Sequence, residues 1–163
     1  MTARTLLERL KETIFECLDE TFTEVHGVYL DKGCSLFPTL ESVSPQEASR
    51  SVSPDSATLA AQVEHVRFYL DVLNDIMRDR EIVKVDWKEI WRTIGQVTPE
   101  EWEDQKRRLG ESYERVMATL KSFDTWDGEY EIAGALSILS HTAYHLGGVR
   151  QALSAIRAVN NQK

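Results

Sequence analysis

Two histidines stand four residues apart in the stretch HTAYHLGGVRQAL, residues 141–153. Residues four apart on a helix lie one turn above each other on the same face. His141 and His145 could therefore direct one ring nitrogen each at a common point, about 2.0–2.1 Å from a shared metal ion. Such a pair alone is a modest signal, because two histidines can have this spacing and bind nothing. A metal site would need at least one further ligand.

The chain has two other histidines, His26 and His65. His26 falls in the last turn of the first predicted helix, where a cation suits the helix dipole, and we expect it to be exposed. His65 lies in the second predicted helix, about 120° around the wheel from Leu59, on the flank of the apolar half. Burying three imidazoles without a metal or hydrogen-bond partners would be costly. We therefore predict that His65, His141 and His145 hold one divalent ion at the edge of the core.

Two familiar metal-site patterns do not fit these histidines. A zincin needs Glu directly after the first histidine, where this chain has Thr142. A ferritin-like di-iron site needs Glu three residues before a histidine on two helices, and those positions are Gln62, Ile138 and Thr142. Three neutral imidazoles with open positions are typical of a mononuclear site that keeps water or accepts substrate. Zinc and nickel are the candidate metals, and nitrogen ligands alone do not separate them.

Small residues share the histidine face of the last helix, namely Gly134, Ser137, Gly148 and Ala152. A glycine inside a helix costs about 1 kcal/mol relative to alanine, so a local gain is expected. Room for a ligand and close packing of a neighbouring helix explain it equally well. Tyr69, one turn after His65, is a candidate proton donor, and an ordinary core tyrosine is the alternative interpretation.

Four long segments with helical periodicity must position these residues, and no strand pattern competes with them. Their predicted bounds are Thr5 to Gly27, Ser53–Pro54 or Ser56 to about Arg80, Thr98 with an apolar stripe as far as Phe123, and Tyr130 to about Val159. Capping patterns mark two of the starts, at Thr5–Glu8 and at Thr98–Glu101. We predict a single all-α domain over residues 1–163, a four-helix bundle.

Two connections in this plan are long. Residues 28–53 are rich in Ser and Pro, with a short helix expected at Ser44–Glu47, and form either a surface linker or a binding loop or lid. Residues 81–97 hold Trp87 and Trp91, which we expect on a short helical turn. A turn is expected around Asp127–Gly128.

The last predicted helix is apolar on two sides. One face carries His141 and His145, and a second stripe repeats every seventh position at Ile132, Leu139, Leu146 and Leu153. A helix that is apolar all round is normally buried, so the second stripe needs cover. Either the long connection or a second copy of the chain could supply it, and we expect a homodimer.

Composition narrows the classes of partner. The 163 residues have a formal net charge of -8 and no basic stripe, which argues against a nucleic-acid partner. No apolar run approaches the roughly 20 residues needed to span a bilayer, so we expect no membrane partner and a cytoplasmic location. The two cysteines do not suggest a disulfide framework, and Cys17 is expected in the core. Cys34 in a loop could be a reactive thiol, but an ordinary loop cysteine is the favoured interpretation.

The chain resembles the DinB-like (YfiT-like) superfamily over most of its length. Its last helix matches the family form H-x-x-[YH]-H-x-G-x-[IV]-R-Q through seven residues: His141, Tyr144, His145, Gly147, Val149, Arg150 and Gln151. The family's histidine in the second helix matches His65, and WKEIWRTIGQVTPEEWEDQKRRL leads into the third helix as in the family. One departure is Gly148, where the family often has glutamine.

The resemblance implies a four-helix bundle with an atypical connection order, commonly dimeric, with a metal held by three histidines. Characterised members are similar in being thiol-dependent metalloenzymes that act on small electrophiles with a low-molecular-weight thiol. We therefore expect a thiol-dependent transferase with a small-molecule substrate. The alternatives are a metal-dependent hydrolase using the same ligands, a non-catalytic metal-binding stress protein, and a helical interaction module without metal.

Overall fold

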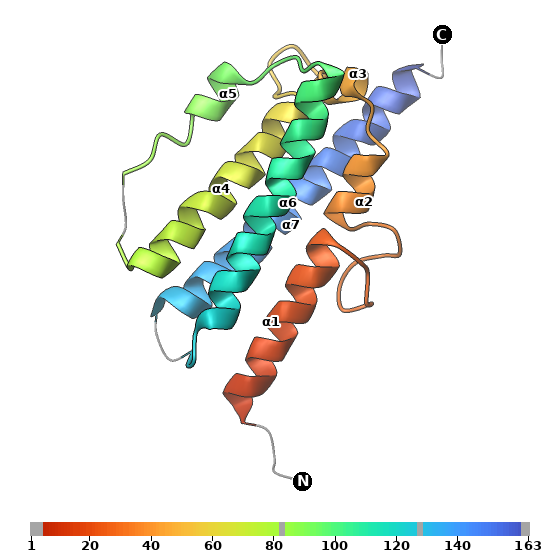
Figure 1. Cartoon of the computed structure of the whole chain (residues 1–163). Helices are drawn as coiled ribbons and strands as arrows, with labels where there is room; N and C mark the ends of the chain where they lie inside the picture. The colour runs from red at the N-terminus through yellow and green to blue at the C-terminus, as the bar shows by residue number, and fades with distance from the viewer. Residues whose placement is uncertain (1–4, 82–83, 127–128, 161–163) are drawn as a thin grey trace.

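The computed structural model describes residues 5–81, 84–126 and 129–160, and Figure 1 shows that these residues form an all-helical structure. No β-strand occurs among them. Their helices, in chain order, are α1 (Leu6–Phe22), α2 (Leu36–Glu41), α3 (Pro45–Ala48), α4 (Leu59–Asp79), α5 (Glu89–Thr93), α6 (Pro99–Ser122) and α7 (Glu129–Asn160). The prediction of an all-α fold class is confirmed.

The four long helices, α1, α4, α6 and α7, lie alongside one another (Figure 1). The most extensive packing is that of α4 against α6 and against α7, while α1 packs on α7. Helices α4 and α6 run in the same direction, and the chain segment with α5 returns along the outside of α4 to the start of α6 (Figure 1). The helix with His65 and the helix with His141 and His145 are therefore direct neighbours.

Capping boxes define three of the helix starts. Thr5 with Glu8, Ser44 with Glu47, and Thr98 with Glu101 each form a capping box, in which a hydroxyl and a carboxylate satisfy each other's backbone N–H. Proline occupies the first turn of α3 and α6, where a missing N–H costs nothing. The predicted starts at these three places are confirmed.

Helix α1 ends five residues before the predicted Gly27. The buried carboxylate of Glu20 accepts backbone hydrogen bonds from His26, Val28, Tyr29 and Leu30, at 2.5–2.9 Å. These bonds fold the following segment back against α1, so the backbone N–H groups do not continue the helix. Gly27, at φ +84°, serves a turn within that segment instead.

Helix α4 begins later than predicted. Thr58 caps it by accepting a hydrogen bond from the Ala61 N–H, at 3.1 Å. The Ser53–Ser56 segment, where we expected the start, forms a separate turn closed by Ser53 and Ser56. The sequence also failed to predict α2, a six-residue helix within the 28–53 connection that buries Leu36 and Leu40. A six-residue helix containing a proline is too short to show helical periodicity.

The core is formed by apolar residues from all four long helices. Its largest fully buried side chains are Leu18 and Phe22 of α1, Leu36 and Leu40 of α2, Leu59, Leu70 and Met77 of α4, Trp102, Leu109 and Leu120 of α6, Trp126, and Ile138 of α7. The predicted stripe of α1 is wrong at its start, because Leu6 is 84% exposed and Leu10 is also exposed. Both cysteines are free and only half-buried, including Cys17, which we expected in the core.

The second apolar stripe of α7 is covered largely within the chain. Leu146 and Leu153 are buried, and Ile132 and Leu139 are half-buried and pack against the core. Helix α1 lies on α7 and contributes this cover. This stripe therefore does not by itself require a second copy of the chain. Within residues 5–81, 84–126 and 129–160, no helix has the length and hydropathy that a membrane-spanning segment requires.

Candidate metal centre

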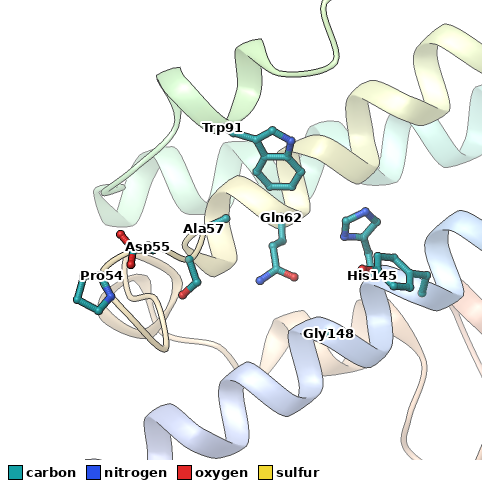
Figure 2. A pocket seen from close by; sticks show the side chains of 9 residues that line it. Pro54, Asp55, Ala57, Gln62, Trp91, His145 and Gly148 are labelled. Carbon is teal, nitrogen blue, oxygen red and sulfur yellow. The ribbon is translucent and has the colours of Figure 1, made fainter.

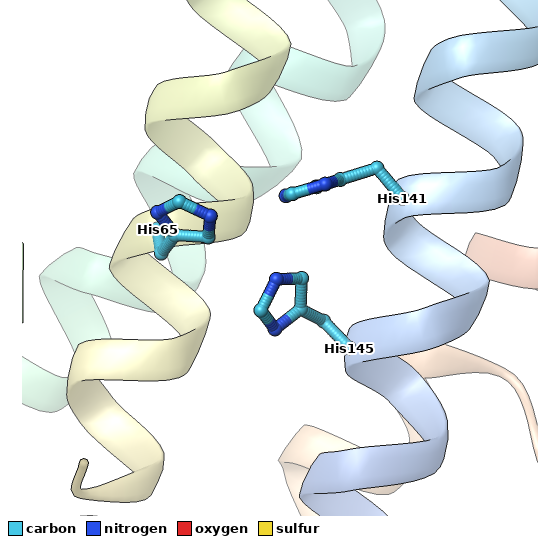
Figure 3. Close-up of side chains that lie close together, drawn as sticks. All are labelled: His65, His141 and His145. Carbon is cyan, nitrogen blue, oxygen red and sulfur yellow. The ribbon is translucent and has the colours of Figure 1, made fainter. Parts of the chain in front are cut away.

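Three histidine rings meet between α4 and α7. His65 points from α4 toward His141 and His145 of α7, as Figure 3 shows. Each of the three offers one potential ligand atom, and these atoms all lie within 4.8 Å of one another. The ring centroids are 5.0 Å apart for His65 and His141, 4.9 Å for His65 and His145, and 4.6 Å for His141 and His145. The structure thus brings together the three histidines singled out in the sequence.

Buried apolar neighbours hold the two helices in the register that this cluster needs. On α7, Ile138 lies one turn before His141 and Val149 one turn after His145, and both are fully buried. On α4, Val63 and Val66 flank His65 and are equally buried. His65 itself is 7% exposed, more buried than its position on the helical wheel predicts. A helical wheel describes α4 alone, so it could not show that Trp87 and Trp91, from the segment around α5, cover this side of α4.

All three imidazoles are held in the neutral form. Burial lowers the pKa of His65 and lowers the pKa of His141 to about 4, an effect that the neighbouring rings of His145 and His65 increase. Burial and the nearby His65 likewise lower the pKa of His145 to about 4. A neutral imidazole has a free lone pair on one nitrogen, which is the form that binds a metal ion. The cluster is therefore ready to act as a ligand set at neutral pH.

Two ring nitrogens in the cluster are buried without a hydrogen-bond partner among the described residues. They are His65 Nδ1 and His141 Nε2. A buried polar atom without a partner costs about 1–3 kcal/mol, so such atoms are rare in native structures. Coordination of a cation would satisfy such a nitrogen. The three residues fit a divalent ion that prefers nitrogen ligands.

Aromatic rings enclose the cluster on the α4 side. Tyr69 stacks on His141, and its hydroxyl hydrogen-bonds with Ser137 of α7. Trp91 of α5 lies 4.5 Å from His65 between ring centroids, and Trp87 lies 6.4 Å from it. The short helical turn predicted for these tryptophans is present as α5, which includes Trp91 and begins two residues after Trp87. This segment covers the histidines from the outside.

A cavity of about 710 Å³ opens beside His145 (Figure 2). Its walls are the loop 54–57, Gln62 of α4, Trp91 of α5, and Tyr144, His145 and Gly148 of α7. The 28–53 connection, which we considered as a lid, does not line this cavity. It packs instead along the second half of α7, where Arg150 donates hydrogen bonds to the Gly33 carbonyl and the Thr39 hydroxyl.

The two glycines on the histidine face have different roles. A Cβ at Gly134 would lie 2.4 Å from the Met77 sulfur, so this glycine permits the close approach of α4. A Cβ at Gly148 would lie 3.2 Å from Gln62 Oε1, and Gly148 faces the cavity. Both interpretations left open by the sequence thus apply, one to each glycine.

Sequence reasoning missed Gln62 and Asp55 as residues of this site. Gln62 is one turn before His65 on α4, and that spacing could have identified it as a neighbour of the cluster. Asp55 had no such signal, because the position of its loop depends on the packing of α3, α4 and α5. Comparisons of the chain with protein-family models, curated proteins and solved structures found no match.

Proposed function

We propose that His65, His141 and His145 hold a single divalent metal ion, zinc or nickel, and that the protein is a metal-dependent enzyme of the DinB-like type. The observation that carries this proposal is the convergence of three potential ligand atoms within 4.8 Å from two neighbouring helices. The parallel course of α4 and α6 in Figure 1 is in keeping with a four-helix bundle of atypical connection order. The motif of the last helix supports the same assignment.

The reaction we propose is transfer of a low-molecular-weight thiol to a small electrophile. When bound, a divalent ion would lower the pKa of a coordinated thiol, whose proton would pass to solvent. The sulfur would then form a C–S bond as the bond from the electrophilic carbon to its leaving group breaks. The chain has three further roles in this reaction. Tyr69 orients the His141 ring, Trp91 shields His65 from water, and the cavity beside His145 receives the substrate. A structural metal site is normally closed, whereas this ligand set lies next to an open cavity that a substrate could enter. The arrangement therefore supports a catalytic role.

The metal site is tested with two histidine variants. His141→Ala removes one of the three converging rings, and the purified variant should lose its metal in elemental analysis. His26→Ala is the matched control, because His26 is exposed and pairs with Asp19 at 2.5 Å, away from the cluster. Full metal content in His141→Ala would reject the site.

The reaction class is tested separately on protein with its metal bound. Product formation from a panel of electrophiles should require added thiol. Hydrolysis products without thiol would instead indicate a metal-dependent hydrolase. A metal-loaded protein without either activity would be a binding protein.

The homodimer expected from the sequence also remains a proposal, now supported by a different surface. An uncharged strip of α7 faces outward and includes Leu136, 44% exposed, Ser140, Tyr144, 77% exposed, and Gly147. Its two exposed large side chains, Leu136 and Tyr144, could be buried against a second copy of the chain. In sedimentation equilibrium, Leu136→Asp should shift the protein toward the monomer, while Val28→Asp on another surface should not. A monomer mass for the wild type at all concentrations would contradict the proposal.

A further inference from the structure

The charges around the cavity beside His145 are one-sided. Its lining includes the carboxylate of Asp55 and has no lysine or arginine. Asp55 is exposed and forms no ion pair with any of the described residues. Asp55 differs in this from acidic groups that pair with arginine, such as Glu64 with Arg67 at 2.6 Å. The charge of the Asp55 carboxylate can therefore interact with a ligand that enters the cavity.

The remaining walls favour neutral or cationic groups. Figure 2 shows Gln62 between the loop that holds Asp55 and the ring of His145. The Gln62 carboxamide can both donate and accept hydrogen bonds. Trp91 and Tyr144 add two partly exposed aromatic rings, whose faces attract cations by up to about 1 kcal/mol at exposed sites. At the end of the cavity remote from the histidines, an anion would meet the like charge of Asp55 and no lysine or arginine.

A second cavity of the chain has the opposite character. It has a volume of about 580 Å³ and is lined by two arginines of α7, Arg150 and Arg157, with hydroxyl groups of Thr39 and Ser42. Arg157 pairs with Glu47, while Arg150 contacts only carbonyl and hydroxyl oxygens among the described residues. The chain thus places basic residues at a cavity on one side of α7 and leaves the histidine side without them.

We infer that the cavity beside His145 selects a small molecule whose end remote from the histidines is neutral or positively charged, and that Asp55 provides this selection. The inference rests on the proposed function for the orientation of the ligand, with its thiol at the three histidines. It names the substrate class of that site: an amine- or hydroxyl-bearing thiol in preference to an acidic one.

Three thiols of equal length test the inference: 6-aminohexanethiol, 6-mercaptohexanol and 6-mercaptohexanoate. The long chain keeps the terminal group from changing the acidity of the thiol. Each is titrated into the protein loaded with cobalt(II), and binding is followed by the sulfur-to-cobalt absorption band. The wild type should bind the amine more tightly than the acid by about threefold or more, and less so at high salt.

Two variants separate Asp55 from the general acidity of the chain. Asp55→Asn should reduce the preference for the amine over the acid by about threefold. Glu114→Gln, which changes the net charge equally at a different cavity, should leave the preference unchanged. Equal preference in the wild type and in both variants would overturn the inference.

The failure of the proposed function has a different signature. If no thiol produces the absorption band in the wild type, the histidines do not present a thiol to a metal. The charge selection is then measured on the protein without metal, from the change in tryptophan fluorescence when hexylammonium or hexanoate is added, since Trp91 lines the cavity. Equal binding of these two probes in that experiment would also overturn the inference.

Discussion

Tyr69 of α4 stacks face to face on His141 of α7, with ring centroids 3.7 Å apart and ring planes inclined by 10°. The hydroxyl of Tyr69 is tied to Ser137, one turn before His141 on the same helix. Burial raises the pKa of Tyr69 above its ordinary value, at which a tyrosine hydroxyl is already protonated at neutral pH. The ring therefore orients His141, and the hydroxyl remains available as the proton donor considered from the sequence.

Substitution of Tyr69 separates these two roles. Tyr69→Phe keeps the stacked ring and should retain metal affinity, whereas Tyr69→Leu should weaken it by about 10-fold or more, as loss of a ligand-orienting group does. Metal affinity is measured by competition with a chelator. Equal affinity in the two variants would show that the stack does not orient the ligand. Loss of turnover in Tyr69→Phe with metal bound would assign the hydroxyl to proton transfer.

The ionisation of Glu20 makes the stability of the folded protein depend on pH in the acid range. Burial alone raises its pKa, but the four backbone hydrogen bonds from residues 26–30 outweigh this and lower the pKa to about 2. A depressed pKa stabilises the folded state at pH above the unfolded value, about 4.5, and this stabilisation is lost as pH falls through about 2. The wild type should therefore unfold at progressively lower urea concentrations as the pH falls from about 4.5 to about 2.

Glu20→Gln should be less stable than the wild type at pH 7 and should lose part of that pH dependence. An amide cannot accept four backbone hydrogen bonds with the strength of a carboxylate. Glu16→Gln is the matched control, one turn earlier on the same helix and exposed. If the two variants unfold alike at every pH, the carboxylate does not hold the segment after α1 in place.

The close approach of Met77 to Gly134 predicts that alanine substitutions at two different glycines will change the stability of the protein in opposite directions. Gly134→Ala would drive a methyl group into Met77, which is fully buried, and should destabilise the protein by about 1–3 kcal/mol. Gly110→Ala in α6 has no atom within 4 Å of the added Cβ. It should stabilise the protein by about 0.5–1 kcal/mol, because alanine is the better helix former. Thermal unfolding of both variants measures the difference, and stabilisation by Gly134→Ala would contradict the close packing.

Most of the helical plan could be predicted because its signals are local. The capping boxes at Thr5, Ser44 and Thr98 act over three residues, and the predicted starts agree with the structure. The errors lie where a distant group decides. Glu20 ends α1 early through residues up to ten positions further along the chain, and Thr58 caps α4 after an independent turn at Ser53–Ser56. The turn predicted around Asp127–Gly128 lies outside the described residues.

The sequence alone determined that His141 and His145 share a face, because four residues make one helical turn and no neighbour can change that. It also determined the acidic balance and the apolar faces of the long helices, except at the start of α1. Only the tertiary structure decided that His65 meets the pair, that Tyr69 stacks on His141, and that Asp55 and Trp91 line the cavity beside them. These relationships depend on the distance and register between helices, and core packing sets both over separations in sequence that no local pattern spans.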